Sequence, residues 1–365
     1  MKLQFSTFLL LFLFSSCDES ADAGSDDPSN LTLDITISED GSGLVNIEAM
    51  ADNTTDYHFY SGVSGEVDPI ENTTGVFEYT YLSSGIYTVE VLAFGSSGRF
   101  IKKTEQITVE TENNVQPGDG YITPPSYDGM TLVWSDEFDG NSLNLADWTF
   151  EIGNGNGGWG NDELEYYLEA NTTVTEGILT IEAKNESFNG YDYTSSRIIT
   201  KGKQQFRYGR VDIRAVLPYG QGLWPALWML GSNIDAVGWP ACGEVDIMEM
   251  VGGSSTDNEV HGTIHWDNNG SYASYGNGTS LASGIFADEF HVFSIIWDEN
   301  KITWYLDDVQ FNVVDITPGS LSEFHQDYFF IFNVAVGGRW PGSPNSFTVF
   351  PQKMMVDYIR VFQDN

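Results

Sequence analysis

Three acidic residues, Glu244, Asp246 and Glu249, lie in one strand-like segment with the sequence GEVDIMEM. Alternate residues of a regular strand share a face, so Glu244 and Asp246 would lie together and Glu249 would point the other way. One extra residue, a β-bulge near Ile247-Met248, returns Glu249 to the face of Glu244. Like charges in a row repel one another, and a fold seldom tolerates this without a function.

Two glutamates on one surface suggest glycoside hydrolysis. In retaining enzymes the two carboxyl groups lie about 5–5.5 Å apart; one attacks the anomeric carbon and the other donates a proton. A neighbouring carboxylate raises the pKa of the acid and keeps it protonated. An exposed acidic strand is the alternative, but the intervening Val245, Ile247 and Met248 are apolar and predict a buried opposite face.

Several aromatic residues have the properties of sugar-binding side chains. Trp224 and Trp228 flank Pro225, and indole faces stack on the apolar face of a pyranose. Tryptophans of β-proteins are usually in the core, so one of these two is expected to be partly structural. Three more lie in loops rich in glycine and proline and are predicted to be exposed for binding: Trp159, Trp239 and Trp340.

Polar residues complete the predicted binding surface. Asn161, Glu163 and Arg197 are expected to form hydrogen bonds with sugar hydroxyls. His265, in the sequence GTIHW, either contacts the leaving-group sugar or is a structural histidine. These two interpretations of His265 stay open at this point.

The elements that must position these residues read as strands. The chain has 365 residues, 38 of them glycine, and 51 aromatics (10 Trp, 18 Tyr and 23 Phe). Short alternating apolar runs recur between turn residues, and no window shows sustained helical periodicity. The sequence therefore predicts an all-β protein.

Five segments are distinguished by composition. Residues 1–17 read as a signal segment, 18–30 as an acidic tether, 31–112 as a small β-sandwich, 113–126 as a linker with three prolines, and 127–365 as one large β-domain. For 31–112 a spacer role is favoured over carbohydrate binding, for which Tyr57, Phe59 and Tyr60 would be the stacking cluster.

The charge and the cysteine content of the chain limit the functions that it can have. Lys and Arg number 15 against 53 Asp and Glu, so 15 − 53 = −38, which argues against a nucleic-acid partner. Cys17 ends the signal segment, and Cys242 is left as a lone, packed thiol.

The N-terminus resembles that of a bacterial lipoprotein. A ten-residue apolar run from Phe5 to Phe14 is too short to span a bilayer and suits a signal peptide. Phe14-Ser15-Ser16-Cys17 resembles a lipobox, whose cysteine is lipidated. Asp18-Glu19 resembles the export tag of Bacteroidota surface lipoproteins. This resemblance implies an anchor in the outer membrane, at the cell surface; ordinary secretion is the alternative.

Residues 130–365 resemble glycoside hydrolase family 16, laminarinase-like endo-β-1,3-glucanases. Besides the acidic segment, the resemblance is carried by LVWSDEF (132–138), WGNDELEYY (159–167), YTSSRI (193–198), GLWPALWMLG (222–231), NVAVGG (333–338) and VDYIRV (356–361). It implies a concanavalin A-like β-jelly-roll sandwich with a sugar groove. Residues 31–112 resemble an Ig/PKD-like β-sandwich, through Tyr79-Thr80-Tyr81 and Tyr87-Thr88-Val89.

The family resemblance also implies roles. Glu244 would be the nucleophile, Glu249 the acid/base, and Asp246 the residue that orients or tunes the nucleophile. Trp224 and Trp228 would lie beside the cleaved bond. The predicted polar residues would lie on its non-reducing side: Asn161, Glu163 and Arg197.

No cofactor is expected for catalysis, but one structural Ca²⁺ is. The resemblance places it away from the groove, at Glu137, the carbonyl of Gly177 and Asp357. Oxygen ligands suit Ca²⁺, and Asp357 amid apolar alternation needs a partner. The alternative is that Asp357 pairs with a nearby Arg or Lys.

The leading hypothesis is a monomeric, retaining endo-hydrolase of β-1,3-glucan or of β-1,3 bonds in mixed-linkage glucan. Residues 127–365 hold 11 Lys and Arg against 33 Asp and Glu, so 11 − 33 = −22, which favours a neutral glucan over a sulfated galactan. The alternatives are an agar- or carrageenan-type galactan hydrolase, a non-catalytic glycan-binding protein and a transglycosylase.

Overall fold

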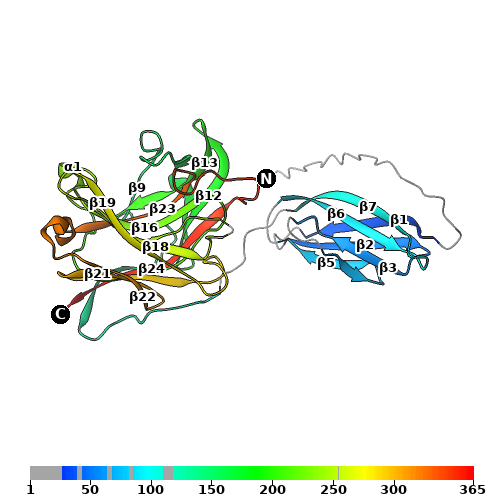
Figure 1. Cartoon of the computed structure of the whole chain (residues 1–365), viewed down its shortest axis with the longest axis horizontal. Coiled ribbons are helices and arrows are strands. Elements are labelled where there is room, and N and C mark those ends of the chain that lie inside the picture. The colour runs from blue at the N-terminus through cyan, green and yellow to red at the C-terminus, as the bar shows by residue number, and fades with distance from the viewer. Residues whose placement is uncertain (1–26, 39–42, 64–67, 82–84, 110–117, 254) are drawn as a thin grey trace, which may run out of the picture. The chain divides into compact units, whose positions relative to one another are not determined.

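The computed structural model describes residues 27–38, 43–63, 68–81, 85–109, 118–253 and 255–365 (Figure 1). The chain forms two compact units, residues 1–114 and 115–365. The signal segment, Cys17 and most of the acidic tether lie outside the described residues. Within the described ranges, no helix is long and apolar enough to cross a bilayer.

The first unit consists of two antiparallel sheets around one apolar core. The three-stranded sheet has the order β1-β2-β5: β1(Ser29–Ile37), β2(Leu44–Asp52) and β5(Val76–Thr80). The four-stranded sheet has the order β4-β3-β6-β7: β4(Ile70–Asn72), β3(Asp56–Tyr60), β6(Gly85–Phe94) and β7(Phe100–Val109). Tyr57 and Phe59 are core residues, 5% and 1% exposed. These two residues are therefore not available to stack on sugar, whereas Tyr60, the third residue of the predicted cluster, is partly exposed.

The second unit is also a sandwich of two large sheets. The seven-stranded sheet has the order β19-β18-β17-β16-β23-β14-β9: β19(Tyr272–Ser280), β18(Glu259–Asp267), β17(Glu244–Glu249), β16(Leu223–Gly231), β23(Tyr328–Val336), β14(Arg197–Ile199) and β9(Thr149–Phe150). The predicted all-β fold is confirmed for both units.

The other sheet has ten strands. Its main path is β10(Glu165–Tyr167), β13(Tyr191–Ser195), β12(Ile178–Phe188), β24(Gln352–Asp364), β15(Gly209–Val216), β20(His291–Trp297), β21(Lys301–Leu306) and β22(Val309–Asp315). β11(Thr172–Thr175) pairs with β12, and β8(Met130–Asp136) pairs with β24. The short helical elements are η1(Glu169–Asn171), α1(Ile234–Val237) and η2(Gly319–His325).

One core contact joins the two sheets directly beneath β17. The buried indole of Trp304, on β21, donates a hydrogen bond from Nε1 to the carbonyl oxygen of Asp246 at 2.8 Å. Trp304 can approach because its neighbour on β18 is Gly262, where a Cβ would lie 2.4 Å from the indole ring. The strand that carries the acidic residues is therefore held from below by the opposite sheet.

Part of the segment predicted to be a linker lies against the ten-stranded sheet. In this strap, residues 118–123, the Tyr121 amide donates to the carbonyl of Phe290 at 2.8 Å. Arg214 donates to the Tyr121 carbonyl at 2.7 Å, and Thr123 is only 2% exposed. Main-chain hydrogen bonds and arginines of the sheet thus make the strap part of the second unit, which composition alone does not reveal.

Candidate active site

The predicted bulge is present in β17. Across the β16–β17 pair, Leu227 is opposite Met248 and Trp228 is opposite Asp246, so Ile247 has no partner residue. Ile247 and Met248 are both fully buried in the core. The extra residue turns Glu249 back to the face of Glu244 and Asp246. We call these three residues the acidic row.

Burial and mutual repulsion raise the pKa values of the acidic row. Asp246 and Glu249 are 2% and 8% exposed. Burial, followed by the charge of Asp246, raises the pKa of Glu244 to about 8. Burial and the charges of both neighbours raise the pKa of Glu249 well above its usual range, and burial does the same to the pKa of Asp246. The three groups interact, so they titrate as a unit.

Two tryptophans donate hydrogen bonds to the glutamates. Trp239 Nε1 lies 2.8 Å from Glu244 Oε2, and Trp224 Nε1 lies 3.1 Å from Glu249 Oε1. The Trp239 hydrogen bond lowers the pKa of Glu244, opposing the effect of burial. Both residues were predicted only as stacking surfaces; the structure adds a role for their indole N–H groups.

His265 belongs to the site rather than to the core. It lies opposite Glu244 in the β17–β18 pair, and its Nε2 is 3.1 Å from Asp246 Oδ2 and 3.7 Å from Glu244 Oε1. Its Nδ1 is 2.8 Å from the hydroxyl of Tyr272. The Tyr272 ring stacks on His265 and lies 5.4 Å from the ring of Trp239. Sequence reasoning missed Tyr272, because only strand pairing brings it to the site.

Arg197 lies between two indoles. Its guanidinium carbon is 4.4 Å from the ring centroid of Trp159 and 4.9 Å from that of Trp228. Its Nε donates to Glu151 at 2.5 Å. Trp159 was predicted to be an exposed binding residue; instead it is partly buried, and its indole nitrogen is buried without a hydrogen-bond partner. Trp159 and Trp228 therefore hold Arg197 in place.

A hydrogen-bond network connects the remaining predicted residues. Glu163 accepts hydrogen bonds from Asn161 at 3.0 Å and from the Tyr167 hydroxyl at 3.2 Å. Asn333 donates to the same hydroxyl at 3.2 Å and accepts from Trp228 Nε1 at 2.8 Å. The network brings together residues from β10, β16, β23 and the loop before β10. Tyr167 and Asn333 were not predicted, because nothing local in the sequence marks them as neighbours.

Beside Glu163 lies a second carboxyl group that sequence reasoning also missed. Glu165 is fully buried; its Oε2 accepts the Val336 amide at 2.7 Å, and its Oε1 has no hydrogen-bond partner. Burial and the charge of Glu163 raise the pKa of Glu165 well above its usual range. Glu165 therefore keeps its proton to higher pH than an ordinary glutamate does.

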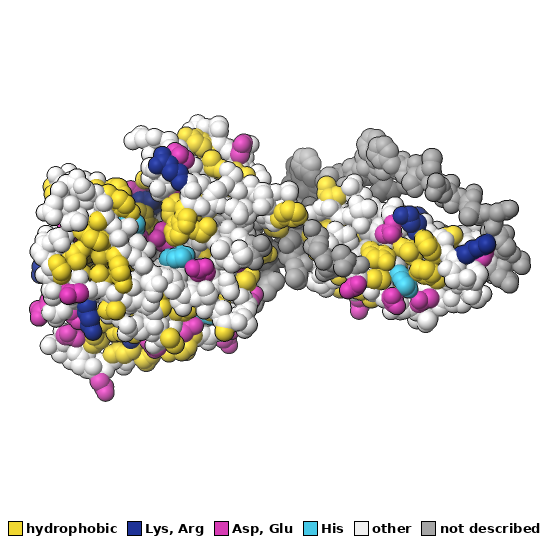
Figure 2. All heavy atoms as spheres, viewed as in Figure 1, with side chains coloured by type: hydrophobic (Ala, Val, Ile, Leu, Met, Phe, Trp, Pro, Cys, Tyr) yellow, Lys and Arg dark blue, Asp and Glu magenta, His cyan; other side chains and the backbone are white. Residues whose placement is uncertain are grey.

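The loop tryptophans Trp239 and Trp340 are exposed as predicted, at 52% and 47%. Trp340 meets Trp224 edge to face at 5.6 Å and lies 5.3 Å from the ring of His261. Aromatic surface thus lies near both Glu244 and Glu249. Figure 2 shows hydrophobic, histidine and acidic side chains exposed together on one face of this unit.

Arginines already form hydrogen bonds with the two carboxylates that were predicted to bind calcium. Arg360 donates two hydrogen bonds to the Glu137 carboxylate, at 2.8 and 2.7 Å, and Arg214 donates to Asp357 Oδ2 at 2.6 Å. The alternative of an arginine partner for Asp357 is thus present in the structure. The Glu137 carboxylate does not fit the predicted role. The main-chain oxygen of Glu137 lies near Gly177, 3.9 Å from where a Cβ of that residue would be.

Buried carboxyl groups beside exposed indoles, on one face of a β-sandwich, are the arrangement expected of a glycoside hydrolase. The sequence profile of the glycosyl hydrolases family 16 matches residues 160–360. This chain belongs to that family and is a glycoside hydrolase, whose chemistry needs no catalytic cofactor.

Individual relatives agree with this assignment. The chain is 39% identical to a beta-glucanase of Rhodothermus marinus, over 64% of this chain and 85% of that protein. It is 40% identical to the clotting factor G alpha subunit of Tachypleus tridentatus, of which it spans only 34%. The laminarinase catalytic domain of Thermotoga maritima superposes with a TM-score of 0.61 at 48% identity, over 65% of this chain and all of that one. The predicted jelly-roll fold is confirmed.

Proposed function

We propose that this protein hydrolyses internal β-1,3 bonds of laminarin-type β-glucan, or β-1,3 bonds of mixed-linkage glucan, with retention of configuration. The observation that carries the proposal is the acidic row on the bulged strand, with a tryptophan donor on each glutamate. The similarity to the laminarinase of Thermotoga maritima supports the choice of substrate.

In this proposal Glu244 is the nucleophile and Glu249 the acid/base. A Glu244 oxygen forms a bond to the anomeric carbon while the glycosidic C–O bond breaks, and the Glu249 proton goes to the leaving oxygen. A water molecule then attacks the anomeric carbon and breaks its bond to Glu244, while a proton of that water passes to Glu249. Asp246, which raises the pKa of Glu244 by its charge, tunes the nucleophile.

Electrostatic coupling explains how Glu249 could serve in both steps. The negative charge of Glu244 is one cause of the raised pKa of Glu249. That charge disappears when Glu244 forms the covalent bond, so the pKa of Glu249 falls. The same residue is thereby an acid before the intermediate and a base after it.

The surrounding residues would bind the glucan on the two sides of the bond that is cleaved at the acidic row. We assign Asn161, Glu163 and Arg197 to the non-reducing side, as the family resemblance implies. In support, Asn161 and Glu163 belong to the hydrogen-bond network that reaches Trp228, and Arg197 stacks on the Trp228 ring. We assign His265 to the leaving-group side, with the exposed ring of Trp239 as a stacking surface.

A substrate panel tests the proposed function. Laminarin, curdlan and lichenan should be cleaved to shortening oligosaccharides, whereas agarose and carrageenan should remain intact. Proton NMR of early laminarin products should show the β-anomer first, and early α-anomer would contradict retention. Galactan cleavage would favour the galactanase alternative, and binding without cleavage would indicate a glycan-binding protein. Lengthened products would indicate transglycosylation.

We also propose lipid anchoring through Cys17, on the strength of the lipobox-like sequence alone. The first unit, residues 31–112, would then be a spacer between the outer membrane and the enzyme. Cys17→Ser should move the protein from the membrane fraction to the soluble fraction. Unchanged fractionation would contradict the anchor.

A further inference from the structure

Three metal-binding atoms converge beside the proposed nucleophile. Glu244, Asp246 and His265 each offer one ligand atom, and these atoms all lie within 4.8 Å of one another. His265 Nε2 is 3.1 Å from Asp246 Oδ2 and 3.7 Å from Glu244 Oε1. Carboxylate oxygen and imidazole nitrogen are the mixed ligands that Zn²⁺ accepts.

The environment of Asp246 gives a second observation. Its side chain is 2% exposed and Oδ2 accepts no hydrogen bond; its close contact there is His265 Nε2 at 3.1 Å, which is an ion pair only when the imidazole is protonated. Buried carboxylate oxygens without a hydrogen bond are costly and uncommon. A cation at this place would compensate that oxygen and reduce the repulsion along the acidic row.

The neighbouring residues already orient the ligands. A metal-bound imidazole usually donates its other N–H to an oxygen, and the Tyr272 hydroxyl lies 2.8 Å from Nδ1 of His265. Trp239 holds Oε2 of Glu244 and leaves Oε1 on the side of His265. The arrangement thus presents Oε1, Oδ2 and Nε2 to one point.

We propose that Glu244, Asp246 and His265 form a binding site for a zinc-class divalent cation, and that the bound ion inhibits the enzyme by occupying the nucleophile. The inhibitory consequence rests on the proposed function; the binding of the ion does not. Ca²⁺ and Mg²⁺ prefer all-oxygen sites and bind here more weakly.

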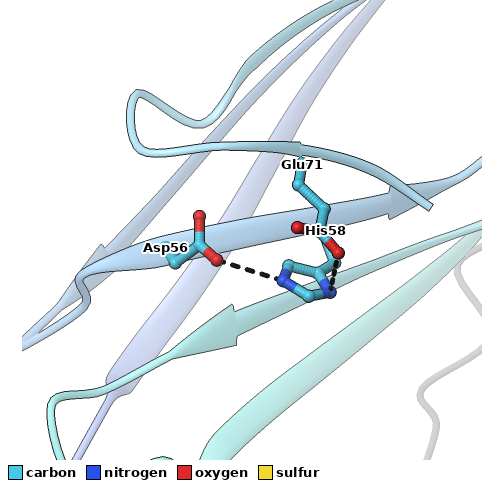
Figure 3. Close-up of side chains that lie close together, drawn as sticks. All are labelled: Asp56, His58 and Glu71. Carbon is cyan, nitrogen blue, oxygen red and sulfur yellow. Dashed lines mark hydrogen bonds and ion pairs between the residues drawn. The ribbon is translucent and has the colours of Figure 1, made fainter.

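A second cluster of similar composition, in the first unit, also has its three ligand atoms within 4.8 Å of one another, but its carboxylates are more exposed. Figure 3 shows Asp56 and Glu71 approaching different nitrogens of His58, Nε2 at 3.0 Å and Nδ1 at 3.5 Å. The side chains of Asp56 and Glu71 are 36% and 58% exposed. Because its two carboxylates approach different nitrogens of the imidazole and are more exposed, this cluster carries no proposal and provides a control.

The first experiment measures laminarin hydrolysis by the full chain against ZnCl₂ concentration. Zn²⁺ should inhibit competitively with laminarin and reversibly on addition of chelator, and equal concentrations of Mg²⁺ or Ca²⁺ should not. The activity of each variant is expressed relative to its own metal-free rate. On this scale His265→Gln should need at least about tenfold more Zn²⁺ than the wild type for half-inhibition. The matched control is His261→Gln, on the same strand, which should keep wild-type zinc sensitivity. Equal sensitivity of the His265 variant and wild type would overturn the proposal.

Calorimetric titration with ZnCl₂ tests the site without relying on activity. In a His58→Gln background, which removes zinc binding at the control cluster, one site should remain, and adding His265→Gln should abolish it. Tyr272→Phe should weaken it while leaving every ligand in place. Zinc binding unchanged by the His265 substitution contradicts the site. A wild-type enzyme that binds zinc but cleaves no glucan contradicts the proposed function instead.

Discussion

The hydrogen bond from Trp239 to Glu244 should set the pH at which the enzyme becomes active. Trp239→Phe keeps an aromatic ring but removes the N–H that lies 2.8 Å from Glu244 Oε2. That bond stabilises the carboxylate and lowers its pKa, against burial and Asp246, which raise the pKa to about 8. Without it, the pKa of Glu244 should rise further, and a higher pH is needed to ionise the nucleophile.

The expected shift follows from the strength of one charge-assisted hydrogen bond. Such bonds contribute about 1.5–3 kcal/mol, and one pKa unit corresponds to about 1.4 kcal/mol. Trp239 is 52% exposed, so water partly replaces the lost donor and the lower end applies. The acidic limb of the pH profile, where activity rises as the row loses its proton, should therefore move up by about 1 pH unit.

The assay is the pH dependence of kcat/KM on laminarin, which reports ionisations of the free enzyme. Because the acidic row titrates as a unit, the acidic limb reports an apparent pKa of the whole row and not of Glu244 alone. Trp340→Phe is the matched control: Trp340 is 47% exposed and contacts Trp224 edge to face. It should change KM but not the acidic limb. An acidic limb that stays in place in Trp239→Phe would refute the reasoning.

Three further predictions concern the rest of the second unit. Glu165 is buried with a raised pKa, so the wild type loses stability as pH rises above about 4.5, the ordinary pKa of a glutamate. The gain in Tm of Glu165→Gln over the wild type should therefore be larger at pH 8 than at pH 4.5, by about 3 °C or more. Equal Tm differences at both pH values would contradict a raised pKa of Glu165. Arg214→Met leaves Asp357 unpaired and releases the strap, so differential scanning calorimetry should show a loss of about 2–3 kcal/mol, and an unchanged Tm would contradict this. If Ca²⁺ binds near Gly177, chelator should lower Tm and added Ca²⁺ restore it; no response to either argues against the ion.

The strand that carries the acidic row was predictable because its signal is local. The spacing of Glu244, Asp246 and Glu249 is incompatible with a regular strand that buries Val245 and Ile247, so a bulge was required. The structure contains it at Ile247. The same local alternation of apolar and polar residues predicted the strands of both units, whereas the sandwich of the second unit was implied by the family resemblance.

The residues that were missed depend on contacts between distant strands. Tyr272 reaches His265 through the β18–β19 pair, and Tyr167 meets Asn333 across 166 residues. Trp159 appeared exposed because its loop is rich in glycine, but Arg197 stacks on its ring. No pattern in the sequence reveals such pairings.

The roles of Glu244 and Glu249 are tested most directly by the kinetics of Glu249→Gln on two substrates. On laminarin, whose leaving group needs a proton, kcat should fall on the order of 10²–10⁴-fold. On an aryl β-glucoside of matching linkage with a good leaving group, formation of the glycosyl-enzyme should stay near the wild-type rate, because no proton is needed. Near-wild-type turnover of laminarin by Glu249→Gln would contradict the assignment.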